Sequence, residues 1–348
     1  MAAAVHNRLP GRPGDQHRRR LYGAPFQDRI SAVPLARFLD RLPPRAAAFL
    51  ALVVTSALWG SNAVVARGLL DGISAIWLAW LRWSVVCVIL LPFVWRERRE
   101  IVAGLRSHTR ELAIFALIGF APQNVLNYSG LSGTTAINAA LLNSTIPVMI
   151  VAIIAVTKRR APALFEAIGL GISAMGVLLI IAHGDPRSIV RLDFNAWDML
   201  VLASMFVWAL YTIRLGEREI PLSFAAFCFA AGLIGLVLTL PAIGWEVARH
   251  GLPRPSLTTL AGILYLGALP TLTAMLLLGF AVARVGAVQA GIFTHLVPVF
   301  AAIFATLAIG EHLHAFHAAG FALIAGGAVL CCLTPSPMLS SRPGARSA

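Results

Sequence analysis

The stretch Ala287-Val-Gln-Ala-Gly-Ile-Phe-Thr-His-Leu-Val-Pro298 recurs in weaker form 151 residues earlier in the chain. An ungapped comparison of residues 136–179 with residues 287–330 gives ten identities in 44 positions. The identities pair Pro147 with Pro298, Gly169 with Gly320, and Gly176 with Gly327. A period of about 150 residues is too long for a solenoid and is typical of duplicated membrane proteins. The chain therefore uses one hydrophobic unit twice.

The composition places that unit in a lipid bilayer. Of the 348 residues, 58% are hydrophobic and only 12% are charged, with a mean hydropathy of +0.80. Long uncharged runs cover residues 46–66, 112–157 and 255–283. Because a spanning helix needs about 20 apolar residues, these runs are long enough to cross a membrane.

The spacing of Gly, Pro and charged residues divides the chain into ten expected helices. They cover residues 46–66, 73–95, 112–128, 134–156, 163–182, 198–214, 221–244, 257–281, 286–309 and 315–334. We therefore predict an all-α integral membrane protein with ten transmembrane helices. Five helices lie on each side of the long loop, and an odd number per half inverts the second half relative to the first.

The basic residues of the loops predict the orientation. With the N-terminus inside, the inner loops carry eleven Lys and Arg residues and the outer loops five. Cytoplasmic loops are enriched in such residues, so we expect both termini in the cytoplasm of a multi-pass protein of the cell (inner) membrane.

The predicted organisation has five parts. They are a basic disordered cytoplasmic tail at 1–45, a first five-helix repeat at 46–182, an outer linker at 183–197, a second five-helix repeat at 198–334 and a cytoplasmic tail at 335–348. The first tail holds nine arginines and three aspartates, but its prolines argue against a folded nucleic-acid-binding domain. The lipid bilayer is the expected partner of these charges, rather than nucleic acid. Nothing in the sequence supports a homodimer.

Several short motifs resemble one family. They are Leu58-Trp59-Gly60-Ser61-Asn62, Leu81-Arg82, the alanine-rich run into Pro147, Trp208-Ala209, and the series from Pro298 through Gly310-Glu311 to Gly327. Their order and duplication resemble the EamA-type transporters of the drug/metabolite transporter superfamily, over residues 46–334. The resemblance implies two inverted five-helix repeats and the export of small metabolites such as amino acids. Glu311 has no counterpart in the first repeat, where Arg159-Arg160 stand opposite Gly310-Glu311.

Arg82 is the first candidate for substrate binding. It lies near the middle of the second expected helix, where a charge is costly unless it has polar partners or water. Arg82 either holds a substrate carboxylate or a carbonyl group in a central cavity, or it extends to the interface or bonds backbone to lock two helices.

Two helices each carry a pair of polar or aromatic residues on one face. Trp59 and Asn62 are three residues apart on the first helix, and Trp208 and Tyr211 repeat that spacing on the sixth. Repeat symmetry brings the two helices together, so we expect these four side chains to form a pocket at mid-membrane. Packing or a place in the aromatic belt is the alternative.

The third and fourth helices are rich in uncharged polar residues. The substrate-binding candidates among them are Gln123, Asn127 and Asn143, which stand among Asn124, Tyr128, Asn138, Ser144 and Thr145. Such residues can bond helices to one another, but eight of them on two adjacent helices indicate a wet cavity wall.

Three further residues have possible roles in the transport cycle. His295 is the histidine expected in the middle of a span, and because imidazole titrates near neutral pH it is a candidate for proton coupling. A neutral, hydrogen-bonded core histidine is the alternative. Pro147 and Pro298 are expected to bend the fourth and ninth helices.

The cluster Glu311-His312-Leu-His314-Ala-Phe-His317 contains metal-ligand types, but it falls at an expected outer turn, where a solvated cluster is the better interpretation. We therefore expect no metal, and the sequence indicates no cofactor. It contains no GxxxxGK[ST], HExxH or GxSxG motif.

The sequence favours a secondary transporter that is not an enzyme and that exports a small-molecule substrate by alternating access. The substrate would be an amino acid, a related compound or a drug-like antimetabolite. The alternatives are a membrane-embedded enzyme acting on a lipid or a phosphorylated substrate, and a non-transporting sensor or channel subunit.

Overall fold

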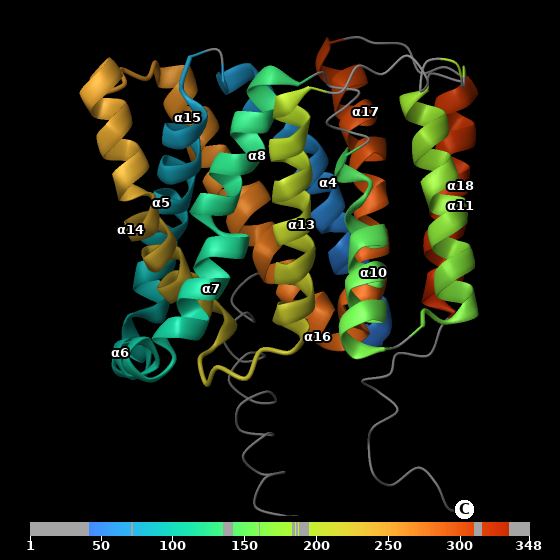
Figure 1. Ribbon diagram of the computed structural model, residues 1–348, viewed down its shortest axis with the longest axis horizontal. Coiled ribbons are helices and arrows are strands. Elements are labelled where there is room, and N and C mark those ends of the chain that lie inside the picture. The colour runs from blue at the N-terminus through green and yellow to red at the C-terminus, as the bar shows by residue number, and fades with distance from the viewer. Residues whose placement is uncertain are drawn as a thin grey trace, which may run out of the picture.

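A computed structural model describes residues 42–70, 72–134, 142–159, 161–182, 185, 187, 195–309 and 315–333. These residues form a bundle of helices and contain no strand (Figure 1). The first half holds α4 (Pro44–Leu70), α5 (Ala75–Val94), α6 (Arg98–Ser107), α7 (Thr109–Gly119), α8 (Ala121–Gly133), α10 (Ile146–Lys158) and α11 (Leu164–Ile181). The second half holds α13 (Ala196–Gly216), α14 (Phe224–His250), α15 (Leu257–Leu266), α16 (Ala274–Ile292), α17 (Leu296–Ile309) and α18 (Ala315–Cys332). Two three-residue 3-10 turns, η1 (Trp95–Glu97) and η3 (Phe293–His295), and a short π-helix, η2 (Gly267–Thr273), join some of them.

Five helical segments are long and apolar enough to cross a membrane. They cover Pro44–Leu70, Ala75–Ser107, Ala196–Gly216, Phe224–His250 and Leu257–Phe304, and α10, α11 and α18 are shorter apolar helices. Each of the ten ranges expected from the sequence overlaps an apolar helix. Residues 135–141 of the fourth range, almost all of the tail at 1–45, most of the linker, and Asn138 lie outside the described residues.

Polar side chains fix where several helices begin. Ser74, Ser223 and Ser256 accept hydrogen bonds from backbone N–H groups in the first turns of α5, α14 and α15. Asn195 does the same for α13 and accepts from the N–H groups of Trp197 and Asp198, at 2.9 and 3.2 Å. Each cap accepts hydrogen bonds from backbone N–H groups that have no partner within the helix, and so sets the residue at which the apolar helix begins.

Backbone breaks divide two of the expected helices and mark the boundary between two others. The range 112–128 is split into α7 and α8 at Phe120, whose φ of −122° and ψ of −145° are not helical. A seven-residue π-helix, η2, contains Pro270 and separates α15 from α16. Gly286, with a φ of 85°, interrupts α16 at the boundary expected between the eighth and ninth helices. This φ favours glycine, which carries no Cβ.

The two repeated prolines lie at matching places. Pro147 is in the first turn of α10, just after the turn at Ser144 and Thr145, and Pro298 is in the first turn of α17, just after η3. A proline is tolerated there because the first turn needs no N–H donor. Both prolines therefore follow a break rather than interrupt a continuous helix.

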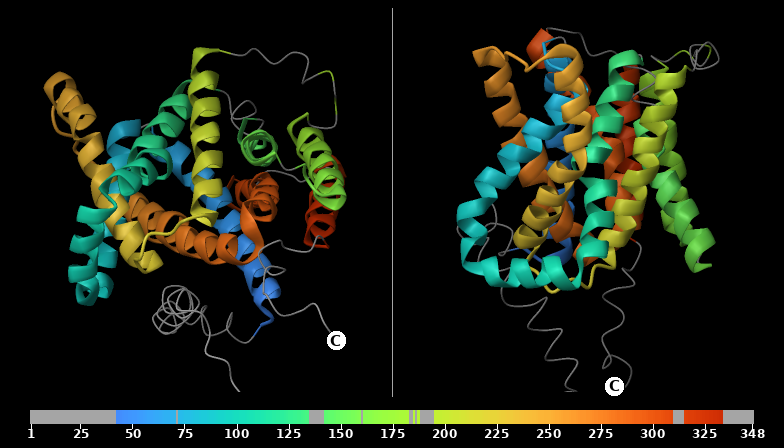
Figure 2. Two further views of the ribbon diagram at one scale, coloured as in Figure 1. Left: turned by 60° about the horizontal axis from the view of Figure 1, so that its bottom comes forward. Right: turned by 60° about the vertical axis from the view of Figure 1, so that its left-hand side comes forward.

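The repeated glycines bring α11 and α18 into close contact at one edge of the bundle (Figures 1 and 2). A Cβ atom on Gly169 would lie 2.6 Å from the carbonyl oxygen of Gly327, and one on Gly176 would lie 2.7 Å from that of Gly320. Residue numbers rise along one helix as they fall along the other, so the helices are antiparallel. In the repeat, Gly169 aligns with Gly320 and Gly176 aligns with Gly327. The contacts are therefore crossed, because Gly169 faces Gly327 and Gly176 faces Gly320.

We predict that Gly176→Ala destabilises the protein by about 1–3 kcal/mol, because the new methyl group meets backbone atoms that cannot turn aside. Gly171 lies on the same helix with nothing within 4 Å of a built Cβ. Gly171→Ala should leave stability unchanged or raise it by up to about 1 kcal/mol, since alanine is the better helix former. Thermal unfolding of the purified variants compares them, and equal midpoints would contradict the close packing.

Candidate substrate site

Arg82 lies on α5 and is buried, with 4% of its surface exposed. Its guanidinium reaches polar side chains of two other helices. Nη1 donates to Oδ1 of Asn62 on α4, at 3.1 Å, and to the hydroxyl group of Tyr128 on α8. Nη2 donates to Oδ1 of Asn124, also on α8. The buried charge is therefore bonded to side chains of neighbouring helices, and does not extend to the membrane surface.

The four side chains form one network, which we call the Arg82 cluster: Asn62, Arg82, Asn124 and Tyr128. The hydroxyl group of Tyr128 also donates to Asn62, at 3.2 Å, and the Arg82 guanidinium lies 5.0 Å from the centre of the Tyr128 ring. The side-chain amide of Asn124 is held by the carbonyl oxygen of Phe120, at 2.8 Å. Charge-assisted hydrogen bonds and the cation–π contact both stabilise a guanidinium away from water.

Every oxygen atom that Arg82 contacts in the described residues is electrically neutral. Its Nε atom is buried and has no hydrogen-bond partner there. Of the three buried carboxylates in the described residues, Glu166 and Asp198 serve at helix starts, where they accept from the backbone N–H groups of Ala163 and Asn195, and Glu246 lies near the C-terminal end of α14. An uncompensated buried cation is unfavourable, so the cluster is suited to receive an anionic group.

An aromatic contact joins α4 to α13 close to the Arg82 cluster. Trp59 lies one turn from Asn62 on α4, and its ring meets that of Trp208 edge to face, with centroids 5.4 Å apart. Trp208 stacks on Tyr211 at 5.0 Å. The Tyr211 ring is fully buried and packs against Phe115 and Phe120, which places it in the core behind Trp208.

The other polar candidates, Gln123, Asn127 and Asn143, do not join the Arg82 cluster. Gln123 turns away from Arg82, and its Nε2 donates to the backbone carbonyl of Ser204 on α13, at 3.3 Å. Asn127 on α8 and Asn143 before α10 are half-buried, and neither side chain bonds to a described residue. The structure brings Asn62, Arg82, Trp59 and Trp208 together and places Asn143 on a separate segment.

His295 is buried between the two halves of the chain. Its Nε2 lies 3.0 Å from the carbonyl oxygen of Ser144, and its Nδ1 lies 2.6 Å from the hydroxyl oxygen of Ser173 on α11. A carbonyl only accepts, so Nε2 carries a proton and donates to Ser144. Ser144 is the residue that aligns with His295 in the repeat, so the two copies touch at equivalent positions.

The histidine cluster near residue 312 falls largely outside the described residues, which include only His317. The His317 ring contacts those of Phe316 and Phe321 on α18. Within the described part of the chain, no group of three or more His, Cys, Asp or Glu residues could hold a metal ion.

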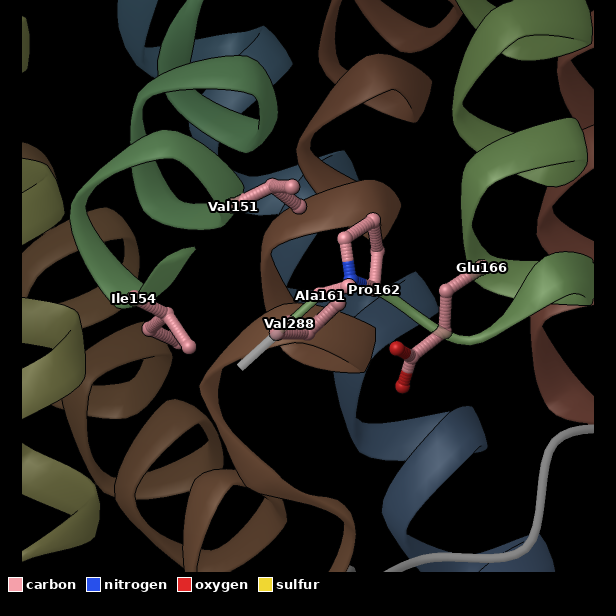
Figure 3. A pocket seen from close by; sticks show the side chains of 6 residues that line it. All are labelled: Val151, Ile154, Ala161, Pro162, Glu166 and Val288. Carbon is pink, nitrogen blue, oxygen red and sulfur yellow. The ribbon is translucent and has the colours of Figure 1, made fainter. Parts of the chain in front are cut away.

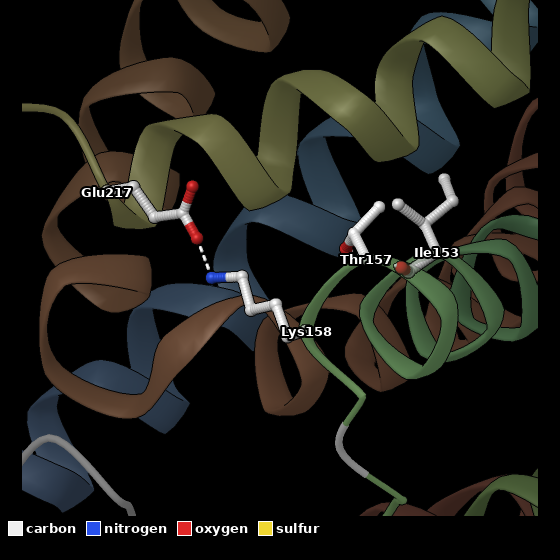
Figure 4. Close-up of polar contacts among 4 residues, drawn as sticks. All are labelled: Ile153, Thr157, Lys158 and Glu217. Atoms are coloured by element: carbon white, nitrogen blue, oxygen red, sulfur yellow. Dashed lines mark hydrogen bonds and ion pairs between the residues drawn. The ribbon is translucent and has the colours of Figure 1, made fainter.

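A small pocket lies apart from the Arg82 cluster (Figure 3). It is lined by Val151, Ile154, Ala161, Pro162, Glu166 and Val288, and its volume of about 10 Å³ would hold about one water molecule. Nearby, Lys158 at the end of α10 forms an ion pair with Glu217 at the end of α13 (Figure 4). Both side chains are partly exposed, at 46% and 40%, so this pair contributes little to stability.

Sequence reasoning did not identify the partners of Arg82. Asn124 and Tyr128 stood among the polar residues of the third helix, and their spacing of four residues places them on one face. That spacing was the available signal. A further contact, from the Tyr265 hydroxyl on α15 to the hydroxyl oxygen of Ser61 on α4 at 2.7 Å, had no signal in the sequence.

Comparisons with known proteins agree with this architecture. Residues 46–182 and 195–333 both match the EamA-like transporter family. An "Uncharacterized transporter" of Archaeoglobus fulgidus is 27% identical over 81% of this chain and 96% of its own. A "Probable terminal-alkyne amino-acid exporter" of Streptantibioticus cattleyicolor is 30% identical, in an alignment that covers 75% of this chain and 85% of the exporter. A solved crystal structure has a TM-score of 0.63 at 18% identity, covering 82% of this chain and 96% of that one, which shows a shared fold.

We predict that Ser173 and His295 are energetically coupled. Ser173→Ala and His295→Leu should each destabilise the protein, because each leaves a buried polar group without its partner. The double variant should lose less stability than the two single variants lose together. The difference, measured by denaturant unfolding, is a coupling energy of about 0.5–3 kcal/mol. Ser107→Ala, on an exposed hydroxyl group of α6, is the control and should combine additively with His295→Leu. If the stability losses of Ser173→Ala and His295→Leu were additive, the result would contradict a hydrogen bond between the two side chains.

Proposed function

Because the chain belongs to the EamA-like transporter family, we propose that it is a secondary transporter that exports a small metabolite. The protein is a multi-pass membrane protein whose relatives are named as transporters. We propose an amino acid, a related compound or an amino-acid-like antimetabolite as the substrate. The relative from Streptantibioticus cattleyicolor, which is named as a probable amino-acid exporter, supports this class.

The observation that carries the proposal is the uncompensated charge of Arg82. Two neighbouring helices, α4 and α8, supply neutral oxygens to this guanidinium, and its Nε has no hydrogen-bond partner among the described residues. A substrate carboxylate would bind the edge formed by Nε and Nη2 in bidentate fashion and displace the amide oxygen of Asn124. Trp59 and Trp208, one turn along, would contact the apolar part of the substrate.

Two contacts support an inverted repeat as the framework of transport. Gly169 faces Gly327 while Gly176 faces Gly320, which is the reciprocal pattern of a two-fold axis. His295 bonds to Ser144, its own counterpart, as a residue close to such an axis would. We therefore propose two five-helix repeats, at 46–182 and 198–334, that rock against each other about this axis.

Contacts between the halves lie at both ends of the bundle. At one end Lys158 pairs with Glu217. At the other end the hydroxyl group of Thr134 donates to Asp198, and the amide of Asn195 donates to the carbonyl oxygen of Gly133 at 3.3 Å. Alternating access would break one set of contacts while the other holds. The excess of arginines beside Lys158 supports the cytoplasmic side for that end.

We predict that Arg82→Ala and Trp59→Ala each abolish resistance to a toxic amino-acid analogue in cells that overexpress the protein. The measurement is growth across a panel of analogues, with protein level in the membrane as a check. Arg82→Lys keeps the charge but loses the bidentate edge, so we expect about a 10- to 100-fold rise in KM for flux into inside-out vesicles.

Arg67→Gln is the matched control, because Arg67 is exposed in the last turn of α4. It should transport as the wild type does. If Arg82→Ala exports every effective analogue at the wild-type rate, Arg82 does not bind substrate.

We also propose that His295 takes up and releases the coupling proton. Its described partners are a carbonyl and a hydroxyl group, and the Ser173 hydroxyl can donate to a neutral ring or accept from a protonated one. His295→Gln should therefore lose flux driven by a pH gradient in liposomes and retain exchange of labelled for unlabelled substrate. Unchanged gradient-driven flux would remove His295 from the coupling mechanism.

A further inference from the structure

Helix α6 differs from the other helices in direction. It is viewed end-on in Figure 1, whereas α5 and α8 run along the bundle, and both views in Figure 2 place it at the edge of the molecule. It follows α5 through η1 and leads into α7. Residues 98–107 lie between two expected spans, and no helix was predicted there. A helix lying across the end of a transmembrane bundle is positioned like an interfacial helix.

One face of α6 docks on the protein. Ile101 and Gly104 are buried, and a Cβ atom on Gly104 would lie 3.1 Å from Cδ1 of Leu222, in the connection between α13 and α14. At 100° per residue, Arg99 and Arg106 project from the opposite face. They are two turns apart, or about 10 Å along the axis. Both are exposed, so the outward face of α6 presents two guanidinium groups in line.

Three exposed apolar side chains lie in the same segment as these arginines. Phe93 is 66% exposed, Trp95 is 58% exposed and Val102 is 47% exposed. The guanidinium of Arg98 lies 5.7 Å from the Trp95 ring and donates to the Trp95 carbonyl oxygen, at 3.3 Å. Tryptophan is enriched at the level of the lipid headgroups. An apolar helix end followed by an exposed tryptophan and a basic helix is the pattern typical of the level where acyl chains meet headgroups.

The charges of this segment favour an anion. Five exposed arginines, Arg96, Arg98, Arg99, Arg106 and Arg110, are accompanied by Glu97, Glu100 and Glu111. None of these arginines forms an ion pair with a described residue. Their guanidinium N–H groups can therefore donate hydrogen bonds to a bound anion. Five arginines and three glutamates give residues 95–111 a net charge of +2.

We propose that α6 is a binding site for anionic phospholipids, with Arg99 and Arg106 as the principal ligands of the lipid phosphate. The exposed Phe93 and Trp95 beside them contact the acyl chains and the headgroup layer. A soluble acidic partner fits less well, because these apolar side chains lie where the bilayer covers the protein. The phosphate is an oxygen-rich anion that accepts the forked donors of arginine.

A lipid at this position would hold the connection between two helices of the substrate site. Helix α5 carries Arg82, and α7 leads into α8, which carries Asn124 and Tyr128. Because α6 joins α5 to α7, lipid binding to α6 fixes the ends of both helices together. The site depends only on the membrane location of the protein, and not on what the protein transports.

The test uses the full chain in lipid nanodiscs of phosphatidylcholine with increasing phosphatidylglycerol. Native mass spectrometry counts the phosphatidylglycerol molecules retained on release, and thermal unfolding gives the stabilisation by that lipid. In Arg99→Gln/Arg106→Gln we expect about 25-fold weaker retention, from about fivefold for each arginine near an anionic surface. Its unfolding midpoint in pure phosphatidylcholine should equal that of the wild type, which shows that the variant folds.

The matched control is Arg249→Gln/Arg254→Gln, which removes two arginines at the opposite end of the bundle. It should retain phosphatidylglycerol as the wild type does. Retention unchanged in Arg99→Gln/Arg106→Gln would overturn the proposal, since the lipid would then bind elsewhere. An equal loss in both double variants would also overturn it, because it would indicate a general effect of net charge.

Discussion

The guanidinium of Arg82 constrains the arrangement of three helices. A positive charge in the apolar part of the bundle has to be surrounded by polar atoms, and those atoms come from Asn62 on α4 and from Asn124 and Tyr128 on α8. Helix α5 therefore cannot turn or slide against α4 and α8 without breaking charge-assisted hydrogen bonds. The same bonds leave Nε without a hydrogen-bond partner among the described residues, and this is the position at which we propose that a substrate carboxylate binds.

The two repeats share their packing but differ in their chemistry. The glycines of α11 and α18 approach each other reciprocally, and the prolines of α10 and α17 follow equivalent breaks. Arg82 aligns with Leu233 in the second repeat, and His295 aligns with Ser144 in the first. In the rocking mechanism proposed above, a preferred direction would have to come from residues that occur in one repeat only. Arg82 and His295 occur in one repeat only, which makes them candidates for that role.

Much of the fold follows from the sequence because apolar length and helix-breaking residues are local properties. The run from Ala46 to Ala66 lies within α4, and Gly286 falls at the expected boundary. The break at Phe120 was not predicted, because the bulky apolar residue gives no sign of its non-helical φ and ψ. Helix α6 was missed because its apolar positions, such as Ile101 and Leu105, are few among many charges.

The partners of Arg82 depend on helix rotation, which apolar helices encode weakly. Four polar residues of α8 were available, and rotation directs Asn124 and Tyr128 to Arg82 while Gln123 faces Ser204 on α13. Tyr211 shows the same limit, since its spacing from Trp208 suggested a shared pocket but its ring packs into the core. In water, an amphipathic pattern would define the outward face of each helix. In lipid both faces are apolar, so small residues and buried hydrogen bonds decide the rotation, and these act between segments distant in sequence.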